Sequence, residues 1–176
     1  METTVDYGAP KGALEVIAAR RSVRKYLEKP VENEKVLAML RAGMAAPSGK
    51  DLRPWEFVMV TESVVLQAMA AGLPYAKMLA GAPLAIVVCG DTARSAYWYL
   101  DCSAAAQNVL LAAEAQGLGA VWTAAYPYDD RVAVVREALH LPENVVPLCV
   151  IPVGYPATNA APKDKFNFAK VHHERY

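Results

Sequence analysis

A cluster of basic residues lies near the N-terminus, in the stretch ARRSVRKY at residues 19–26. Arginine forms fork-shaped, charge-assisted hydrogen bonds with phosphate, and a serine hydroxyl adds a further donor. Arg20, Ser22 and Arg24 are two residues apart, so an extended backbone would point all three side chains the same way. This spacing indicates a phosphate clamp. The alternative is the last turn of a helix, where cations interact favourably with the helix dipole.

A second pair of cations, Lys163 and Lys165, lies downstream in the stretch APKDKF. Their spacing of two would let both side chains face one ligand. Taken alone, such a pair is more typical of a solvated linker. It becomes a candidate clamp only in combination with other features of the chain.

Motifs for other chemistries are incomplete. The stretch GLGAVW begins like a dinucleotide fingerprint, but Trp122 stands in place of its last glycine, and the stretch leads into a predicted strand. PSGKD resembles the end of a P-loop, but Asp51 replaces the required Ser or Thr. No HExxH or GxSxG motif occurs, and the adjacent His172 and His173 are more typical of a solvated tail than of a metal site. We therefore expect no metal and no hydrolase chemistry.

The composition narrows the class of protein. Eighteen basic and 18 acidic side chains balance, which gives no general reason to bind nucleic acid or an anionic membrane. Cys89, Cys102 and Cys149 are odd in number and widely spaced, so we expect reduced, buried thiols in a cytoplasmic protein. Residues 1–12 lack the apolar run of a signal peptide, and no apolar stretch approaches membrane-spanning length. The apolar fraction of 55 % predicts one domain over residues 1–176, with surface covered by a second copy of the chain.

Hydrophobic periodicity predicts helices that alternate with strands, as in a layered domain. The expected helices span residues 12–22, 32–46, 63–72, 97–117 and 129–141. The expected strands span residues 55–61, 84–90, 118–125 and 145–155. The Ala-rich helix at 97–117 allows close approach and is expected at the centre. Pro147 and Pro152 favour an edge or bulged position for the last strand, because proline donates no ladder hydrogen bond.

Five stretches in order carry a family resemblance. They are RRSVRKY, AAPSGKDLRPWEFVMV, DCSAAAQNVLLAAEAQGLGAVWTAAY, VIPVGYP and PKDKF. Together they resemble the FMN-dependent nitroreductase family over about residues 18–176. The resemblance implies a three-layer α+β fold with a central, mostly antiparallel sheet flanked by helices. It also implies an intertwined homodimer with FMN at the interface, in which residues 156–176 pack on the partner subunit.

The same resemblance implies a set of cofactor-binding residues. It assigns Arg20, Lys163 and Lys165 to the FMN phosphate and Arg24 to the N1/O2 edge of the ring. Arg21 and Ser22 belong to the same first binding segment as Arg20 and Arg24. Lys77 is a weaker candidate for the ribityl chain or ring edge. The remaining matches are the partner loop Pro47, Ser48 and Gly49, and the strand end Trp122, Thr123, Ala124 and Ala125, where a backbone N–H of Ala124 or Ala125 would reach flavin N5.

Two departures from the family pattern affect the expected site. Asp51 and Arg53 replace an Asn and a Gln that are common in the family loop, and they could pair with each other or leave Arg53 to meet an acidic substrate. Ala124 stands where some members carry a Glu, which implies a more apolar site. The aromatic run at residues 97–99 (Tyr97, Trp98 and Tyr99) has two interpretations, a substrate-side patch or packing at the dimer interface.

The resemblance implies an FMN-dependent oxidoreductase with ping-pong kinetics. NADH or NADPH would deliver hydride to flavin N5, and a small, flat, electron-poor acceptor such as a nitroaromatic or a quinone would then take it. No side chain is expected to act as catalytic acid or base. The alternatives are a non-catalytic flavin-binding or storage protein, which would not consume NAD(P)H, and a phosphopeptide or nucleic-acid binder, which would be colourless.

Overall fold

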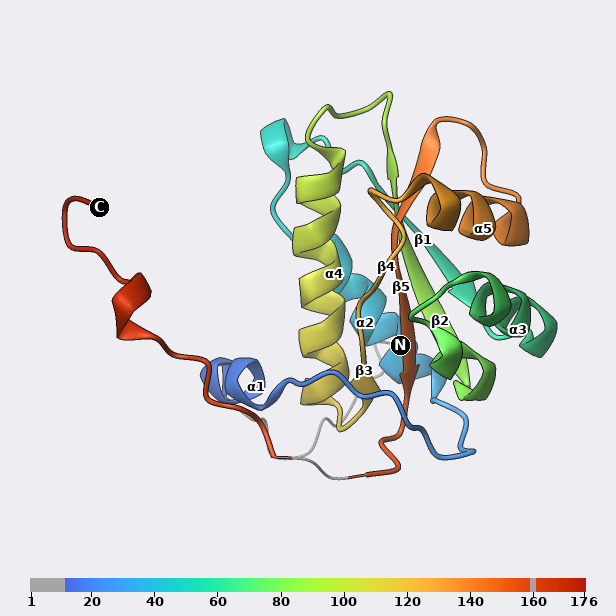
Figure 1. Ribbon diagram of the computed structural model, residues 1–176, viewed down its shortest axis with the longest axis horizontal. Coiled ribbons are helices and arrows are strands. Elements are labelled where there is room, and N and C mark those ends of the chain that lie inside the picture. Colours follow the sequence, from blue (N-terminus) through green and yellow to red (C-terminus); the bar gives the residue numbers. More distant parts are fainter. Residues whose placement is uncertain (1–11, 159–160) are drawn as a thin grey trace, which may run out of the picture.

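The computed structural model describes residues 12–158 and 161–176 of the chain (Figure 1). Its helices are α1 (Ala13–Ala19), α2 (Asn33–Met44), α3 (Ser63–Gly72), α4 (Trp98–Ala115) and α5 (Asp129–Leu139), with short 3₁₀ turns η1 (Gly49–Asp51), η2 (Lys77–Gly81) and η3 (Phe168–Lys170). Its strands are β1 (Trp55–Val60), β2 (Leu84–Asp91), β3 (Gly119–Ala120), β4 (Thr123–Ala124) and β5 (Val145–Gly154). Part of the predicted domain, residues 1–11 and 159–160, lies outside the described residues.

The strands form one antiparallel sheet in the order β1-β2-β5-β3, and β4 also pairs with β5. Helices α2 and α4 cover one face of the sheet, and α3 and α5 cover the other (Figure 1). Alternate residues of β2 enter the two cores, with Ile86 and Val88 on the α4 side and Val87 and Cys89 on the α3 side. Burial on both faces explains the continuous apolar run of this strand. The predicted three-layer α+β fold with a mostly antiparallel sheet is confirmed.

Helix α4 contacts α1, α2 and four strands of the sheet (β1, β2, β3 and β5), the central position that its composition predicts. Ala105, Ala106 and Ala113 are fully buried, and their small side chains let the helix approach both α2 and the sheet. Cys89, Cys102 and Cys149 are buried free thiols, as expected. Among the described residues, no helix combines the length and the apolar content needed to cross a membrane.

The last strand differs from one expectation. β5 lies inside the sheet between β2 and the pair β3 and β4, so the prediction of an edge position is wrong. The bulge is present, because Val88 pairs with Cys149 whereas Cys89 pairs with Pro147, which leaves Leu148 as the extra residue. On its other side β5 faces two strands of two residues each, where one strand over 118–125 was predicted. The break between them lies opposite Pro152, so the sheet loses few hydrogen bonds there.

The basic segment near the N-terminus is not helical. α1 ends at Ala19, and from Arg20 (ψ 127°) the backbone is extended. Ser22 forms a parallel bridge with Ala120, and Tyr26 forms an antiparallel bridge with Pro156. The interpretation of this cluster as a helical last turn is therefore wrong, and the extended backbone needed for a clamp is present.

The chain after β5 leaves the body of the domain. Residues 161–176 are exposed along their whole length and extend past α1 (Figure 1). Phe166 and Phe168 are about three-quarters exposed, which is unusual for aromatic side chains. The expectation that residues 156–176 pack on a partner subunit stays a prediction.

Candidate functional site

A first cavity of about 540 Å³ combines the two predicted clamps. Arg20, at the end of α1, lines it together with Lys163 and Lys165 from the segment after β5. Within residues 12–158 and 161–176, none of these three cations forms an ion pair or a side-chain hydrogen bond. The nearby Asp164 carboxylate accepts the N–H of Phe166 at 2.9 Å. The cavity therefore offers several charged donors to an anion, the chemistry that a phosphate needs.

A second cavity of about 560 Å³ gathers most of the remaining candidates. Arg24 and Lys77 line it with the stretch 122–124, which the sequence also predicted. The Lys77 ammonium donates to the carbonyls of Ala70 (2.9 Å) and Ala71 (3.1 Å), so it is anchored to the end of α3. The rest of the lining is Pro74, Tyr75, Met78, Val121 and Arg131. Apolar walls with cations at the edge suit a flat ring that carries polar atoms on one side.

One extended segment connects the two cavities. Arg20 lines the first cavity and Arg24 the second. At about 3.3 Å per residue, their Cα atoms are at most about 13 Å apart. Between them, Val23 is buried and donates its N–H to the Ala120 carbonyl at 3.0 Å, which fixes the segment on β3. Arg21 is half-buried and Ser22 exposed, and neither lines either cavity.

The strand end at 123–125 offers one backbone donor to the second cavity. Ala125 is fully buried and its N–H donates to the Leu148 carbonyl at 3.0 Å, so this N–H is not available to a ligand. Thr123 faces β5 as well, since its hydroxyl donates to the Val150 carbonyl at 2.6 Å. Successive N–H groups along a strand point to opposite sides. From this alternation we expect the Ala124 N–H to point away from β5, toward the open edge of the sheet. Of the two predicted N–H donors, only Ala124 fits.

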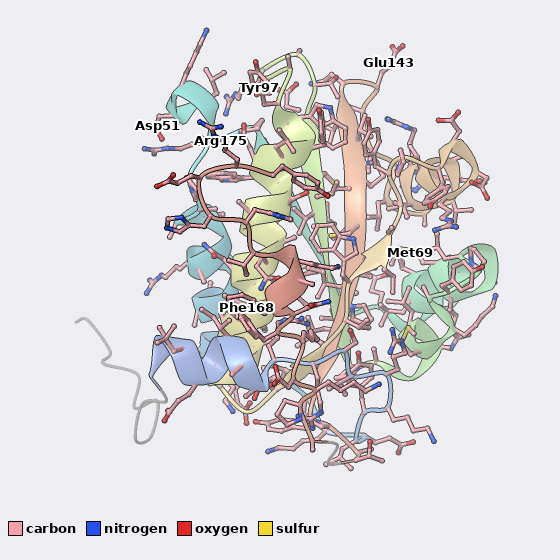
Figure 2. The ribbon with its side chains drawn as sticks, turned by 60° about the vertical axis from the view of Figure 1, so that its left-hand side comes forward. Asp51, Met69, Tyr97, Glu143, Phe168 and Arg175 are labelled. Carbon is pink, nitrogen blue, oxygen red and sulfur yellow. The ribbon has the colours of Figure 1, made fainter. Side chains whose placement is uncertain are left out.

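The loop before β1 has a fixed shape but lies apart from both cavities. Ser48 accepts the Arg53 N–H at 3.0 Å, and the Gly49 N–H donates to the Asp101 carboxylate at 2.9 Å. Neither cavity is lined by these residues or by Pro47. Figure 2 shows Asp51 at the same end of the molecule as Tyr97. This loop does not reach the cavities of its own chain.

The substituted pair in this loop forms an ion pair. Arg53 donates to both carboxylate oxygens of Asp51, at 2.7 and 2.6 Å. These hydrogen bonds lower the pKa of Asp51 below its ordinary value. Lys50, Asp51 and Arg53 have φ values of 54°, 56° and 48°, a left-handed backbone that is uncommon outside glycine. Of the two alternatives that the sequence left open, the structure contains the pairing.

The aromatic run at the start of α4 is divided between core and surface. Trp98 is 7 % exposed, and its ring centroid lies 4.9 Å from that of Tyr126. Tyr97 and Tyr99 are exposed. Trp98 therefore belongs to the core and to neither predicted patch, whereas the two tyrosines keep both interpretations.

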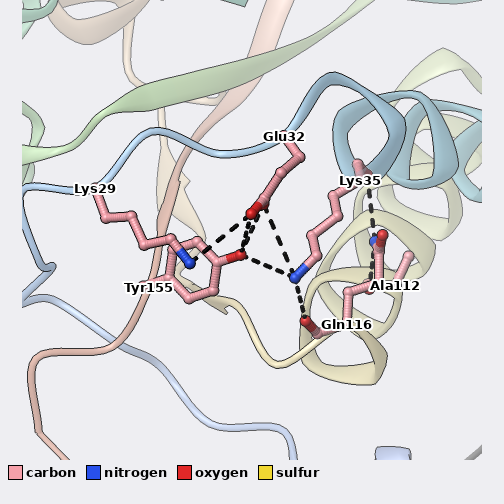
Figure 3. A network of polar contacts seen from close by, with 6 residues as sticks. All are labelled: Lys29, Glu32, Lys35, Ala112, Gln116 and Tyr155. Carbon is pink, nitrogen blue, oxygen red and sulfur yellow. Dashed lines mark hydrogen bonds and ion pairs between the residues drawn. The ribbon is translucent and has the colours of Figure 1, made fainter. Parts of the chain in front are cut away.

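A polar network holds the chain that follows the basic segment (Figure 3). The Tyr155 hydroxyl lies 2.8 and 2.7 Å from the Glu32 carboxylate oxygens, to which it donates, and it accepts from the Lys35 ammonium at 2.9 Å. Lys29 lies 3.8 Å from the centroid of the Tyr155 ring. The hydrogen bond from Tyr155 lowers the pKa of Glu32. The network connects the end of β5 to the start of α2.

Arg131 lines the second cavity and was not predicted from the sequence. The two aspartates at the start of α5 interact favourably with the helix dipole at its N-terminus. Because aspartates are the charges expected there, the arginine that follows them was not predicted as a site residue. A signal was nevertheless present. A cation in the first turn of a helix opposes the dipole, and such a residue commonly has another reason to be there.

Fold and site together define an α+β protein with two cavities at the ends of one extended segment, the first lined by three cations and the second by mainly apolar side chains with cations at its edge. The sequence pattern of the nitroreductase family matches residues 17–72 and 65–155. The chain belongs to the nitroreductase family.

Solved structures resemble the whole fold. One, from Bacteroides thetaiotaomicron, whose proposed activity is NADH dehydrogenase or NAD(P)H nitroreductase, is 67% identical, covers 93% of this chain and 98% of its own, and has a TM-score of 0.93. The FMN-dependent nitroreductase of Clostridium difficile is 31% identical, covers 93% and 99%, and has a TM-score of 0.89. The NADPH:FMN oxidoreductase of Vibrio harveyi, complexed with NAD⁺, is 30% identical, covers 93% and 77%, and has a TM-score of 0.83.

Proposed function

We propose that this chain is an FMN-dependent NAD(P)H oxidoreductase with ping-pong kinetics, whose acceptor is a flat, electron-poor molecule such as a nitroaromatic or a quinone. The observation that carries the proposal is the pair of cavities at the two ends of one extended segment. The names of the similar proteins, which include an FMN-dependent nitroreductase and an NADPH:FMN oxidoreductase, support the same cofactor and co-substrate.

The donor set of the chain fits FMN. Arg20, Lys163 and Lys165 would hold the phosphate, because they line one cavity, where three cations outnumber the single carboxylate of Asp164 and form no ion pair with a described residue. Arg24 would meet the pyrimidine edge of the ring, and the Ala124 N–H would face N5. When bound, FMN supplies hydride transfer at N5, from NAD(P)H to the acceptor.

The protein itself would bind, orient and exclude water. Among the described residues, those that line the second cavity include no carboxylate and no histidine; the Tyr75 hydroxyl and the Lys77 ammonium are the groups there that could carry a proton. Trp122 and Val121 supply apolar wall, which keeps water from the face of the ring. The cation of Arg24 favours negative charge on the ring edge beside it.

We propose further that residues 1–176 form one FMN-binding domain of a homodimer, and that its C-terminal segment, residues 156–176, packs on the partner subunit. An apolar surface groove of about 460 Å³ between α1, α2 and α4 would be covered in such a dimer; it is lined by Ala13, Val16, Ile17, Ala42, Ala45, Asn108, Leu111, Ala112 and Ala115. The exposed Phe166 and Phe168 support a partner for the tail. The loop with Pro47, Ser48 and Gly49 would then lie against the ring of the partner's cofactor, since it reaches neither cavity of its own chain.

The test is the visible absorption spectrum of the purified protein, recorded without air before and after NADH or NADPH is added. We expect a yellow protein with one FMN per chain that bleaches with one of the two donors and recovers its colour with a quinone. A yellow protein that bleaches with neither donor would instead be a flavin-binding or storage protein. A colourless protein that takes up no added FMN would refute the site.

A further inference from the structure

Arg131 lies in the first turn of α5, and its side chain lines the second cavity beside Arg24. The centre of its guanidinium group is 3.7 Å from the centroid of the Tyr128 ring and 5.3 Å from that of the Tyr75 ring. A guanidinium group over an aromatic face at these distances is held in orientation by a cation–π interaction. The side chain is therefore positioned, and its donors have a defined direction.

Those donors lack partners in the part of the chain that the structure describes. Nε of Arg131 is buried and has no hydrogen-bond acceptor there, and the group forms no ion pair with a described carboxylate. A buried donor without an acceptor is unfavourable, and so is a cation in the first turn of a helix. Two unfavourable features at one residue that lines a cavity indicate that a ligand supplies the missing acceptor.

The cavity restricts what that acceptor is. Lys77 is already bound to two carbonyls, and a phosphate finds its donors at Arg20, Lys163 and Lys165 in the other cavity. Lys77 keeps one of its three N–H donors, whereas Arg24 and Arg131 form no side-chain hydrogen bond to a described residue, and none of the described residues that line this cavity is a carboxylate. The acceptor is therefore carried by the flat ring.

We propose that Arg131 donates a hydrogen bond to a pyrimidine carbonyl oxygen of the flavin ring and, with Arg24, stabilises the negative charge that the ring carries after reduction. This inference rests on the proposed function. Arg131 contacts the cofactor through its guanidinium group, and Tyr128 acts as a positioning residue that holds this group. The two arginines act from different elements, the extended segment and α5.

The inference predicts a thermodynamic effect that does not depend on turnover. Arg131→Gln keeps a side chain that can donate a hydrogen bond but removes the charge. Binding of oxidised FMN should weaken severalfold, and binding of reduced FMN should weaken about tenfold more than that. A tenfold difference between the two forms lowers a two-electron potential by about 30 mV. Tyr128→Leu, which removes the ring under the guanidinium, should shift the potential in the same direction by less.

The experiment titrates apo-protein with FMN by flavin fluorescence and measures the midpoint potential of the holoprotein against a reference dye. The matched control is Arg41→Gln, which removes the same charge from the exposed surface of α2. We expect Arg41→Gln to match the wild type in both measurements, and Arg131→Gln to lower both affinity and potential. Should Arg131→Gln fail to fold, Tyr128→Leu decides, with a lowered potential in support and an unchanged one against.

Two outcomes would overturn the inference and leave the proposed function standing. In the first, Arg131→Gln and Arg41→Gln have the same affinity and potential. In the second, Arg131→Gln changes only the KM of an acceptor that carries a carboxylate, which would make Arg131 an acceptor-binding residue. A wild-type protein that binds no FMN would instead refute the proposed function itself.

Discussion

Gly119 sets the position of the basic segment, and adding one methyl group there should displace it. A Cβ at Gly119 would lie 2.6, 2.7 and 2.8 Å from Cγ1, Cβ and Cγ2 of Val23, where ordinary contact begins at 3.4 Å. Relief of the closest contact requires a shift of 0.8 Å, the difference between 3.4 and 2.6 Å. Val23 is buried between Arg20 and Arg24, so the shift carries both arginines away from β3.

We expect two effects of Gly119→Ala. Overpacking at a buried contact costs about 1–3 kcal/mol in the free energy of unfolding. A hydrogen bond to a charged group is worth about 1.5–3 kcal/mol, so a shift that breaks one such bond to the cofactor should lower FMN affinity by at least about tenfold. Urea denaturation of the apo-protein measures the first effect, and flavin fluorescence titration the second.

The matched control is Gly81→Ala. A Cβ at Gly81 meets no atom within 4 Å, so this variant adds the same methyl group without a clash. We expect it to match the wild type in both assays. If Gly119→Ala also bound FMN with wild-type affinity, the extended segment would not position the cofactor. The proposal that Arg20 and Arg24 bind the two ends of one FMN would then be refuted. A loss of stability without any loss of affinity would refute this positioning role in the same way.

Three further results are expected. Arg20→Ala should weaken FMN binding sharply and make it less sensitive to salt, because the phosphate loses a charged donor; a mutant that purifies with full flavin would contradict the clamp. Tyr155→Phe should destabilise the protein near neutral pH, and this difference should become smaller on acidification as Glu32, whose pKa is lowered in the fold, becomes protonated. The hydrogen bond from Lys35 to the Tyr155 hydroxyl is not lost with that protonation; denaturation of both proteins at neutral and acid pH measures the change. Burial raises the pKa of Cys89 and of Cys102 to about 12, so a thiol reagent at about pH 8 should modify them only after unfolding, as read by mass spectrometry.

The layers of the fold could be predicted from the sequence because their periodicity reflects burial directly. A run such as LAIVVCG is buried on both faces of the sheet. The small alanine side chains of α4 allow this helix to pack closely against α2 and the sheet, as the sequence predicted. The position of β5 could not be predicted, because its prolines indicated an edge strand. Pro147 is accommodated by a bulge and Pro152 by a break in the neighbouring strand, and both compensations are made by other parts of the chain.

For the candidate site, the sequence predicted which residues line the cavities better than it predicted their backbone conformation and their hydrogen-bond partners. The spacing of Arg20, Ser22 and Arg24 indicated a clamp, but only pairing with Ala120 decides between an extended segment and a helix end. The sequence also left two candidates, the N–H groups of Ala124 and Ala125, for the donor to flavin N5. The N–H of Ala125 already donates to the Leu148 carbonyl, so this second candidate is excluded. For Arg131 the sequence carries one signal, a cation in the first turn of a predicted helix, but its role depends on the cavity and on a missing partner, which are properties of the assembled fold.

The phosphate cavity also has a consequence for how the protein is made. Its cations come from the segment just after α1 and from the segment beyond β5, so every strand of the sheet is synthesised before the cavity is complete. A nascent chain can therefore fold its three layers without holding the cofactor phosphate. Under the proposed function, cofactor retention would begin only when residues 163–165 are in place, after the strands of the sheet have been synthesised.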